Sequence, residues 1–457
     1  MTLDAATSAE RDIAHHIHPQ TDLDAHVRDG HFNIVRAEGV RLYDEDGHAY
    51  IDGLAGLWSA SLGYSETRII DAVTAQMQRL PYSSTFAQRS HPAATELAER
   101  LTAIAPEPLS HAMFMNSGSE AIDTAVKLVW YYWNAHGRPG KKKIIAREKA
   151  YHGSTIVAAS LTGLPRMQED FDLPVQGVVR APCPHFWRHG RDGESETAFA
   201  RRMADELEAL ILQEGPDTVG AFFAEPIQGA GGVILPPVDY FDHVQAICRK
   251  HDILFVADEV ICGFGRTGKM WGSELYALRP DMMTTAKALS SSYLPISALL
   301  VSTRVSETLR AQSRKLGQFG HGFTYAGHPA CAAAALATLD IYEERDIVAR
   351  AAEMAPYLQN GLRALASHTL IGEVRGTGMI AGVELTRGKD PATPFDAGLG
   401  AGRLVQDAAR ERGLLVRALG DTLAFCPPLI ISEADIALML ERFADALDAV
   451  GSTLSGA

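Results

Sequence analysis

The chain has 457 residues, more than one compact core usually accommodates, so two domains that share an interface are expected. Its 42 basic and 56 acidic residues give a net charge of −14, which disfavours nucleic acid or an anionic membrane as the main partner. No basic leader with an apolar core stands at the N-terminus, and no apolar run approaches the roughly 20 residues of a membrane span. The five dispersed cysteines include no CxxC pair, so free thiols in a reducing cytoplasm are expected.

The first 35 residues are polar and rich in histidine, and they are interpreted as an N-terminal arm without a clear element. The run His15-His16-Ile17-His18 suggests a metal site, but the sequence offers no second ligand group at a suitable spacing. An ordinary surface arm is therefore the favoured interpretation. Residues 40–51 then predict a β-hairpin that turns at Asp46-Gly47.

Between about residues 65 and 330, short apolar runs alternate with helical patterns. This alternation is typical of an α/β fold, in which a mostly parallel sheet has helices on both faces. The clearest predicted strands are 143–146, 219–224, 253–257 and 296–301, and the clearest helices are 197–213 and 240–250.

The pattern changes after about residue 330, where a smaller α+β domain is expected. A helix is predicted at 330–343 and a single strand at 376–385. Ser432 and Asp435 form a plausible capping box at the start of the last helix. The expected division is an N-terminal arm with part of the small domain at 1–65, a large domain at 66–330 and a C-terminal small domain at 331–457.

Asp258 and Lys287 are the most informative pair, because each ends an apolar run. In a pyridoxal phosphate enzyme, a lysine holds the cofactor through a Schiff base and a carboxylate keeps the ring nitrogen protonated. Taken alone, an aspartate at a strand end is more often a cap, and a single lysine is usually solvated. The interpretation of this pair therefore depends on its surroundings.

Two further segments are compatible with a planar cofactor that carries a phosphate. Ser117-Gly118-Ser119 precedes a helix predicted from 120 to about 133, and the free N–H groups and dipole of a helix start attract a phosphate. Plain helix capping is the alternative. Tyr151-His152-Gly153 lies in a loop after a predicted strand, where the ring of Tyr151 either stacks on a cofactor or packs within the protein.

A competing motif follows Asp258. The run from Gly263 to Lys269 matches GxGxxG and all but the last position of a P-loop, where Met270 replaces the hydroxyl residue that would hold Mg²⁺. No convincing helix follows at once, so a nucleotide-binding module is the weaker interpretation. A flexible loop after the Asp258 strand is favoured.

At this point the ordered blocks resemble a known family. The blocks are Glu225–Gly232, Asp258–Gly268, Ala286–Ser290 and Gly322–Pro329, and together they are similar to the class III aminotransferases of the fold type I pyridoxal phosphate enzymes. The resemblance runs from about residue 15 to the C-terminus. Within that class the chain most resembles the pyruvate-dependent ω-transaminases, on the blocks Leu54–Trp58 and Tyr151–Thr155 and on Arg417 before Pro427-Pro428-Leu429.

The resemblance implies a role for each cofactor residue. Lys287 would be the Schiff-base lysine and proton shuttle, and Asp258 would pair with the ring nitrogen of pyridoxal 5′-phosphate. Val260 would pack on the ring face opposite Tyr151, and Thr324 of the neighbouring subunit would help to hold the phosphate. A homodimer, or a dimer of dimers, is therefore expected, with active sites between subunits. The implied cofactor set also includes Ser117, Gly118, Ser119, His152, Glu225 and Phe323.

The resemblance also implies a substrate pocket. Arg417 would bind the carboxylate of the acceptor and swing away for a hydrophobic amine, with Glu225 as a candidate partner of the arginine when no carboxylate is bound. A surface arginine is the alternative. The other implied pocket residues are Leu57, Trp58, Phe86, Ala87, Tyr151 and Ala230. Gln20, Ser83 and Ala87 differ from the family pattern and suggest a roomier or more polar pocket.

The expected activity is the transfer of an amino group from a primary amine or ω-amino donor to pyruvate, giving alanine by a ping-pong mechanism. The alternatives are 2-oxoglutarate as acceptor, a diamine or polyamine as donor, and a decarboxylase or aminomutase of the same fold. No metal is expected in the active site.

Overall fold

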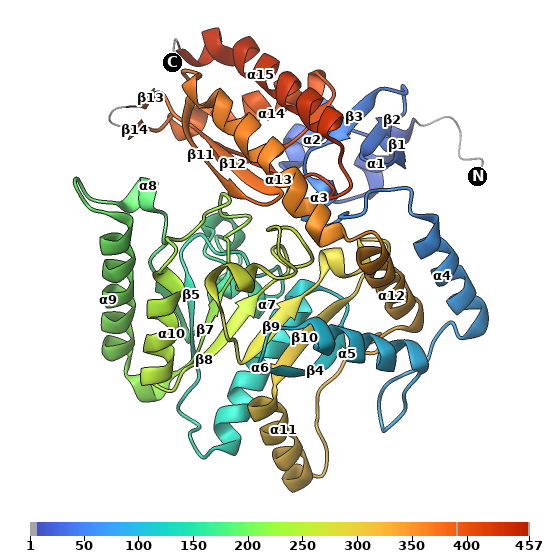
Figure 1. Ribbon diagram of the computed structural model, residues 1–457, viewed down its shortest axis with the longest axis vertical. Helices are drawn as coiled ribbons and strands as arrows, with labels where there is room; N and C mark the ends of the chain where they lie inside the picture. The colour runs from blue at the N-terminus through green and yellow to red at the C-terminus, as the bar shows by residue number, and fades with distance from the viewer. Residues whose placement is uncertain (1–6, 390–391, 456–457) are drawn as a thin grey trace.

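Seven strands form the large sheet of the computed structural model, which describes residues 7–389 and 392–455 (Figure 1). Every neighbouring pair is parallel except the two that β10 makes with β4 and β9. In the order in which they lie across the sheet, the strands are β4 (Leu109–Met115), β10 (Ser297–Ser302), β9 (Met282–Thr285), β8 (Leu254–Asp258), β7 (Val219–Ala224), β5 (Lys143–Arg147) and β6 (Val178–Ala181). The predicted mostly parallel sheet is confirmed, and the four predicted strands differ from the observed ones by at most one residue at either end.

Helices cover both faces of this sheet, because successive strand residues point to opposite sides. On β5, Ile144 belongs to the core that contains α6 (Gly118–Ala135), whereas Ile145 packs with α9 (Glu196–Glu214) and α10 (Tyr240–Lys250). The predicted helices at 197–213 and 240–250 are confirmed. The remaining helices of this part are α4 (Thr67–Arg79), α5 (Pro92–Ile104), α7 (Ile156–Leu161), α8 (Phe186–His189), α11 (Thr303–Leu316) and α12 (Pro329–Glu344), the last of which confirms the prediction at 330–343.

The C-terminal part of the chain forms a second sheet, which appears in orange and red near the top of Figure 1. Its strands lie in the order β11-β12-β17-β16. β11 (Ile371–Thr377) and β12 (Ile380–Leu385) form a hairpin with Gly378 at φ +55° in its turn. The single strand predicted at 376–385 is therefore wrong, since the apolar run crosses a turn. The other elements are α13 (Ile347–Ala364), α14 (Ala401–Glu411), α15 (Glu433–Ser455), β13 (Gly388–Lys389), β14 (Ala392–Thr393), β15 (Leu414–Leu415), β16 (Arg417–Leu419) and β17 (Thr422–Phe425).

The N-terminal arm contains elements that the sequence did not predict, namely α1 (Ser8–His15), α2 (Leu23–Asp29) and β1 (Ile34–Glu38). Side-chain caps explain the short helices. Thr7 and Glu10 form a capping box, and the Asp22 carboxylate accepts two N–H groups at the start of α2. β2 (Arg41–Asp44) and β3 (Ala49–Asp52) confirm the predicted hairpin, and β15 pairs with β3, so both ends of the chain contribute to one sheet.

The glycine-rich segment 263–269 is a turn that docks on the second sheet. Arg266 is 3% exposed and donates hydrogen bonds to the carbonyl oxygens of Met379 (2.9 Å) and Pro427 (2.7 Å). A Cβ atom on Gly378 would lie 2.2 Å from the carbonyl carbon of Thr267, so the two backbones are in contact. The close packing of this turn explains why the segment 263–269 is rich in glycine, and a nucleotide-binding role is not needed to explain it.

Across the described residues, no helix combines the length and the apolar character that a membrane crossing needs.

Candidate active site

The predicted cofactor residues meet at one edge of the large sheet, where the parallel strands have their carboxyl ends. Asp258 is the last residue of β8, and Lys287 follows β9 after Ala286. β8 and β9 are parallel neighbours, with Asp258 in register with Thr284, so the two strand ends lie side by side. The loops after β4, β5 and β7 bring Ser117–Ser119, Tyr151–His152 and Glu225 to the same edge, which is the usual ligand edge of α/β sheets.

The Asp258 carboxylate is buried and held from several directions. Its Oδ2 lies 2.8 Å from Nδ1 of His152, and its Oδ1 accepts hydrogen bonds from the Thr284 hydroxyl and the Val260 N–H, both at 3.1 Å. Asp258 is 3% exposed. An ionised carboxylate accepts about four hydrogen bonds, so one direction stays open for a further cationic N–H donor.

Lys287 has an unusual backbone and an unusual amine. It begins the 3₁₀ turn Lys287–Ser290 with φ +52°, a left-handed conformation that costs an ordinary residue about 1–2 kcal/mol. Burial lowers the pKa of the Lys287 amine to about 8, although the charges of Asp258 and Glu225 act in the opposite direction. A much larger fraction of this amine is therefore neutral near pH 7 than of a solvated lysine, as a nucleophile or base requires.

The start of α6 forms a polar cradle. Ser117 is the N-cap and accepts the Glu120 N–H at 3.2 Å, while the N–H groups of Gly118 and Ser119 have no acceptor within the described residues. A Cβ atom on Gly118 would lie 3.2 Å from both methyl groups of Val260, so glycine keeps this space open. Two free N–H groups at the start of an 18-residue helix suit a phosphate.

Glu225 anchors the loop that carries Tyr151. Its Oε1 accepts the Tyr151 N–H and its Oε2 accepts the Gly229 N–H, both at 3.0 Å. Burial raises the pKa of Glu225 to about 7, while the nearby His152 lowers it. Glu225 makes no hydrogen bond with Arg417 within the described residues, so its observed role is to fix two backbone segments.

A cavity of about 130 Å³ lies between these groups. It brings together eight of the predicted cofactor residues, and its lining consists of Gly118, Ser119, Tyr151, His152, Gly153, Glu225, Asp258, Val260, Ile261, Ala286 and Lys287. The cavity thus has a helix start at one side, a carboxylate with one open direction at another, and a lysine amine with a lowered pKa. These groups fit the phosphate, the ring nitrogen and the aldehyde of pyridoxal phosphate.

Leu57 and Trp58, two predicted pocket residues, point in different directions. Trp58 is 2% exposed and packs with Ile261, which lines the cavity, whereas Leu57 is 55% exposed. Both lie on the short turn α3 (Ala55–Trp58). Ala230 is half-buried on the loop after β7.

Asp52 positions that turn, a role that sequence reasoning missed. The backbone at Ala55 and Trp58 is left-handed, with φ +49° and +64°. The Asp52 carboxylate, 1% exposed, accepts the Leu54 N–H at 2.9 Å and the Gly56 N–H at 2.5 Å. No local pattern marks such an aspartate, because it resembles any residue at a strand end.

The loops at 82–87 and 322–326 contact each other and not the cavity. The Tyr82 hydroxyl donates to the Thr324 carbonyl oxygen at 2.9 Å, and a Cβ atom on Gly322 would lie 2.7 Å from the Phe86 ring. Thr324 and Ala87 are exposed, and Phe323 packs at the edge of the α6 core. Within one chain, therefore, Thr324, Phe323, Phe86 and Ala87 lie outside the Lys287 cavity.

Arg417 begins β16 and has an unpaired guanidinium. Arg417 is half-buried and its backbone pairs with Ala424 of β17, but no hydrogen bond or ion pair joins its side chain to another described residue. Burial lowers the pKa of Arg417, the charge of Arg166 lowers it further, and Tyr151 acts in the opposite direction. The side chain is therefore placed near Tyr151 with its hydrogen-bonding capacity free for an anion.

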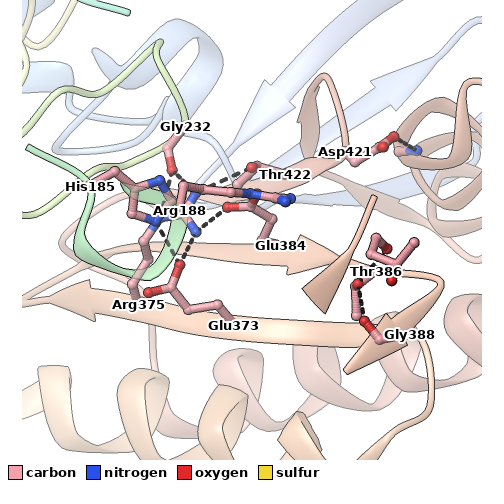
Figure 2. A network of polar contacts seen from close by, with 12 residues as sticks. His185, Arg188, Gly232, Glu373, Arg375, Glu384, Thr386, Gly388, Asp421 and Thr422 are labelled. Carbon is pink, nitrogen blue, oxygen red and sulfur yellow. Dashed lines mark hydrogen bonds and ion pairs between the residues drawn. The ribbon is translucent and has the colours of Figure 1, made fainter. Parts of the chain in front are cut away.

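A buried ionic network fixes the loop that carries Ala230 (Figure 2). Arg375 of β11 donates to the Gly232 carbonyl oxygen at 2.5 Å and forms an ion pair with Glu384 at 2.5 Å. Glu373 lies 2.8 Å from the His185 ring and also pairs with Arg375. The network joins the second sheet to the loop after β7, and sequence reasoning missed Arg375 because its contact with Gly232 spans 143 positions of the chain.

The aminotransferase class III family model matches residues 24–447. The chain belongs to the class III aminotransferases. Among its relatives, the mitochondrial γ-aminobutyrate transaminase 1 of Solanum lycopersicum is 49% identical over 415 residues, which are 91% of this chain and 81% of the relative. The corresponding mitochondrial protein of Oryza sativa subsp. japonica is 49% identical over 417 residues, again 91% of this chain and 81% of the relative.

Solved structures agree with this membership. The ω-transaminase of Pseudomonas jessenii in complex with PMP superposes with a TM-score of 0.97 at 48% identity, covering 99% of this chain and 100% of that one. A PjTA-R6 ω-transaminase variant, engineered for the asymmetric synthesis of bulky amines, gives the same TM-score and identity with 98% and 100% coverage. The fold type I architecture and pyridoxal 5′-phosphate as cofactor, both expected from the sequence, are confirmed.

Proposed function

We propose that this aminotransferase moves an amino group from a primary amine or ω-amino donor to pyruvate, giving alanine in a ping-pong cycle. The observation that carries this proposal is the unpaired guanidinium of Arg417 beside Tyr151. A free guanidinium binds a carboxylate through two parallel hydrogen bonds and is suited to a small 2-oxo acid. The plant relatives are named γ-aminobutyrate transaminases, and the Pseudomonas jessenii neighbour is named an ω-transaminase.

The residues of the cavity then divide the chemistry. Bound pyridoxal phosphate supplies a conjugated cationic ring that accepts electrons from the substrate carbon. Lys287 would hold the cofactor at rest, and its Nζ would carry the proton between the substrate carbon and C4′ of the cofactor. Asp258 would keep the ring nitrogen protonated, since a close opposite charge raises such a pKa by about 1–3 units. Ser117, Gly118 and Ser119 would hold the phosphate.

We further propose a homodimer in which Thr324 and Phe323 complete the neighbouring active site. The contact between the loops at 82–87 and 322–326, away from the chain's own cavity, supports this arrangement. Phe86 and Ala87 would serve the partner's substrate pocket in the same way. The engineered PjTA-R6 variant carries W58M, F86L and R417L, and this chain has tryptophan, phenylalanine and arginine at the same three numbers.

We also propose that the chain divides into domains at residues 65 and 330. A reducing compartment such as the cytoplasm is proposed as its location. The pairing of β15 with β3 supports placing the first 65 residues partly with the C-terminal domain. All five cysteines are buried free thiols, which suits a reducing compartment.

A second candidate acceptor is 2-oxoglutarate. The positive charge of Arg166 acts on Arg417, and a dicarboxylate would pair with both guanidinium groups. A donor panel of γ-aminobutyrate, putrescine and 1-phenylethylamine, tested with each acceptor, separates the candidates. Alanine formed from pyruvate supports the first proposal, and glutamate formed only from 2-oxoglutarate would overturn it.

A further inference from the structure

Three histidines of the N-terminal arm converge on one carboxylate. Asp12 Oδ2 lies 2.8 Å from Nε2 of His18 and 2.9 Å from Nε2 of His26, and Asp12 Oδ1 lies 3.3 Å from Nδ1 of His16. The sequence showed only the run 15–18, without a second group of ligands. Folding supplies the missing groups, because Asp12 is on α1 and His26 comes from α2.

The three rings lie against one another, with His26 mostly buried and His16, whose side chain is 62% exposed, at the surface. The centroids of His16 and His18 are 4.4 Å apart, and those of His18 and His26 are 4.1 Å apart. The His26 side chain is 9% exposed, and that of Asp12 is 19% exposed. Three ring nitrogens therefore face one carboxylate from α1, α2 and the segment that joins them.

The distances suit a small cation. One ligand atom from each of Asp12, His16 and His18 lies within 4.8 Å of the other two, and His26 joins this group through its 2.9 Å contact with Asp12. Bonds of about 2.0–2.1 Å to tetrahedral Zn²⁺ place neighbouring ligand atoms about 3.4 Å apart. The contacts between Asp12 and the three imidazoles, at 2.8–3.3 Å, would therefore lengthen by about 0.1–0.6 Å to admit the ion.

Two further groups of acids and histidines within the described residues are weaker candidates. His185, Glu373 and Glu384 form one group, but Arg375 already pairs with both carboxylates. Asp44, Asp46 and His48 form the other, with a single imidazole, and the Asp44 carboxylate is already occupied by the Tyr50 hydroxyl at 2.8 Å. Neither offers three nitrogen ligands.

A large cavity borders one of the four groups, His26. It has a volume of about 710 Å³, and His26 lines it together with residues of α2 and α14. The segment between His18 and His26 carries Gln20, whose amide nitrogen lies 3.2 Å from the Met167 sulfur on the large domain. A cation bound to both α1 and α2 would therefore fix the arm next to its contact with Met167.

We propose that Asp12, His16, His18 and His26 form a structural binding site for a divalent first-row transition metal ion of the Zn²⁺ type. Three imidazoles and one carboxylate are a ligand set that such ions prefer over Mg²⁺ or Ca²⁺. The site is separate from the cofactor cavity, and the ion has no part in amino transfer.

The test is Zn²⁺ binding to the chelator-treated holoenzyme, measured by calorimetry and by metal content after gel filtration. One Zn²⁺ per chain is expected, and H18Q and H26Q should weaken binding more than about 100-fold, since even an outer-shell partner contributes 10–100-fold. Two control variants should bind Zn²⁺ as the unaltered chain does. H15Q changes an exposed histidine of the same run that is not a proposed ligand. H48Q removes the only imidazole of the group Asp44, Asp46 and His48.

Cofactor absorbance and the metal-free melting temperature establish that each variant is folded. A Zn²⁺-induced rise in melting temperature should be seen in the unaltered chain and in H15Q, and be lost in H18Q and H26Q. Zn²⁺ binding that persists in H18Q and H26Q, or that is lost in H48Q, would overturn the proposal. So would the absence of binding by the unaltered chain.

Discussion

Asp258 and His152 form a buried pair in which Asp258 Oδ2 lies 2.8 Å from His152 Nδ1 and the second ring nitrogen, Nε2, has no partner within the described residues. With Thr284 and the Val260 N–H on its other oxygen, the carboxylate is fixed in one orientation. A fixed, charged acceptor stabilises a protonated ring nitrogen without reorganisation during the reaction.

Asp258→Asn should lower kcat by about 10- to 1000-fold, because loss of a close charge shifts a pKa by about 1–3 units, or 1.4–4 kcal/mol. Single-turnover rates with the cofactor-loaded enzyme measure this. Thr284→Val is the matched control, since it removes one hydrogen bond to Asp258 but keeps the charge. Equal losses in both variants would show that orientation, and not charge, is the contribution of Asp258.

The Lys287 amine of the apoenzyme should titrate with a midpoint at about 8. The depressed value follows from burial, and Asp258 opposes the depression, so Asp258→Asn should move the midpoint lower still. Cyanate modification at a series of pH values, read by peptide mass spectrometry, follows this amine, with the exposed Lys315 as an internal reference. A midpoint for Lys287 near 10.5, the value of an unperturbed lysine, would contradict the account.

Glu225 should make stability fall as pH rises from about 4.5 to about 7. Its pKa is raised in the folded state, so folding favours the protonated carboxyl, and that contribution is complete below the unfolded pKa and absent above the folded one. The shift corresponds to roughly 3 kcal/mol at most. Glu225→Gln should flatten this part of the unfolding free energy between pH 5 and pH 8, whereas Glu441→Gln, at an exposed position on α15, should not. If Glu225→Gln leaves the pH dependence of the unfolding free energy unchanged, the raised pKa of Glu225 is not its cause.

Arg417→Gln should raise the KM for pyruvate by about 10- to 100-fold, because a hydrogen bond to a charged group contributes about 1.5–3 kcal/mol. The KM for 1-phenylethylamine, which has no carboxylate, should change little. Steady-state kinetics with each substrate varied in turn give both values. If KM rises equally for both substrates, Arg417 has no special contact with the acceptor. Arg166→Gln tests the second candidate, since it should impair 2-oxoglutarate more than pyruvate.

The positions of the strand ends were predictable from the sequence. Most of the residues that line the cavity lie at these ends or in the loops that follow them. A buried parallel strand appears as a short apolar run, and the residue that ends it is placed at the ligand edge whatever the rest of the chain does. Asp258 ends β8, and Lys287 and Tyr151 follow β9 and β5 by a few residues, so their place at this edge was predictable, whereas their roles came from the family resemblance; the observed cavity contains all three.

Contacts between distant segments left no such signal. Arg375 meets the carbonyl of Gly232 across 143 positions, and the caps of α1 and α2 stabilise helices too short to show a period. Ala87 is a further example. It has φ +52°, a left-handed backbone conformation that its local sequence does not indicate.

The most direct test of the account is to reduce the holoenzyme with borohydride and locate the cofactor by peptide mass spectrometry. The cofactor mass should be found on Lys287 alone. Lys287→Ala should lose this label, its visible cofactor absorption and alanine formation from pyruvate, while it keeps the fold. A label on any other lysine, or alanine formation that survives in Lys287→Ala, would contradict the central assignment.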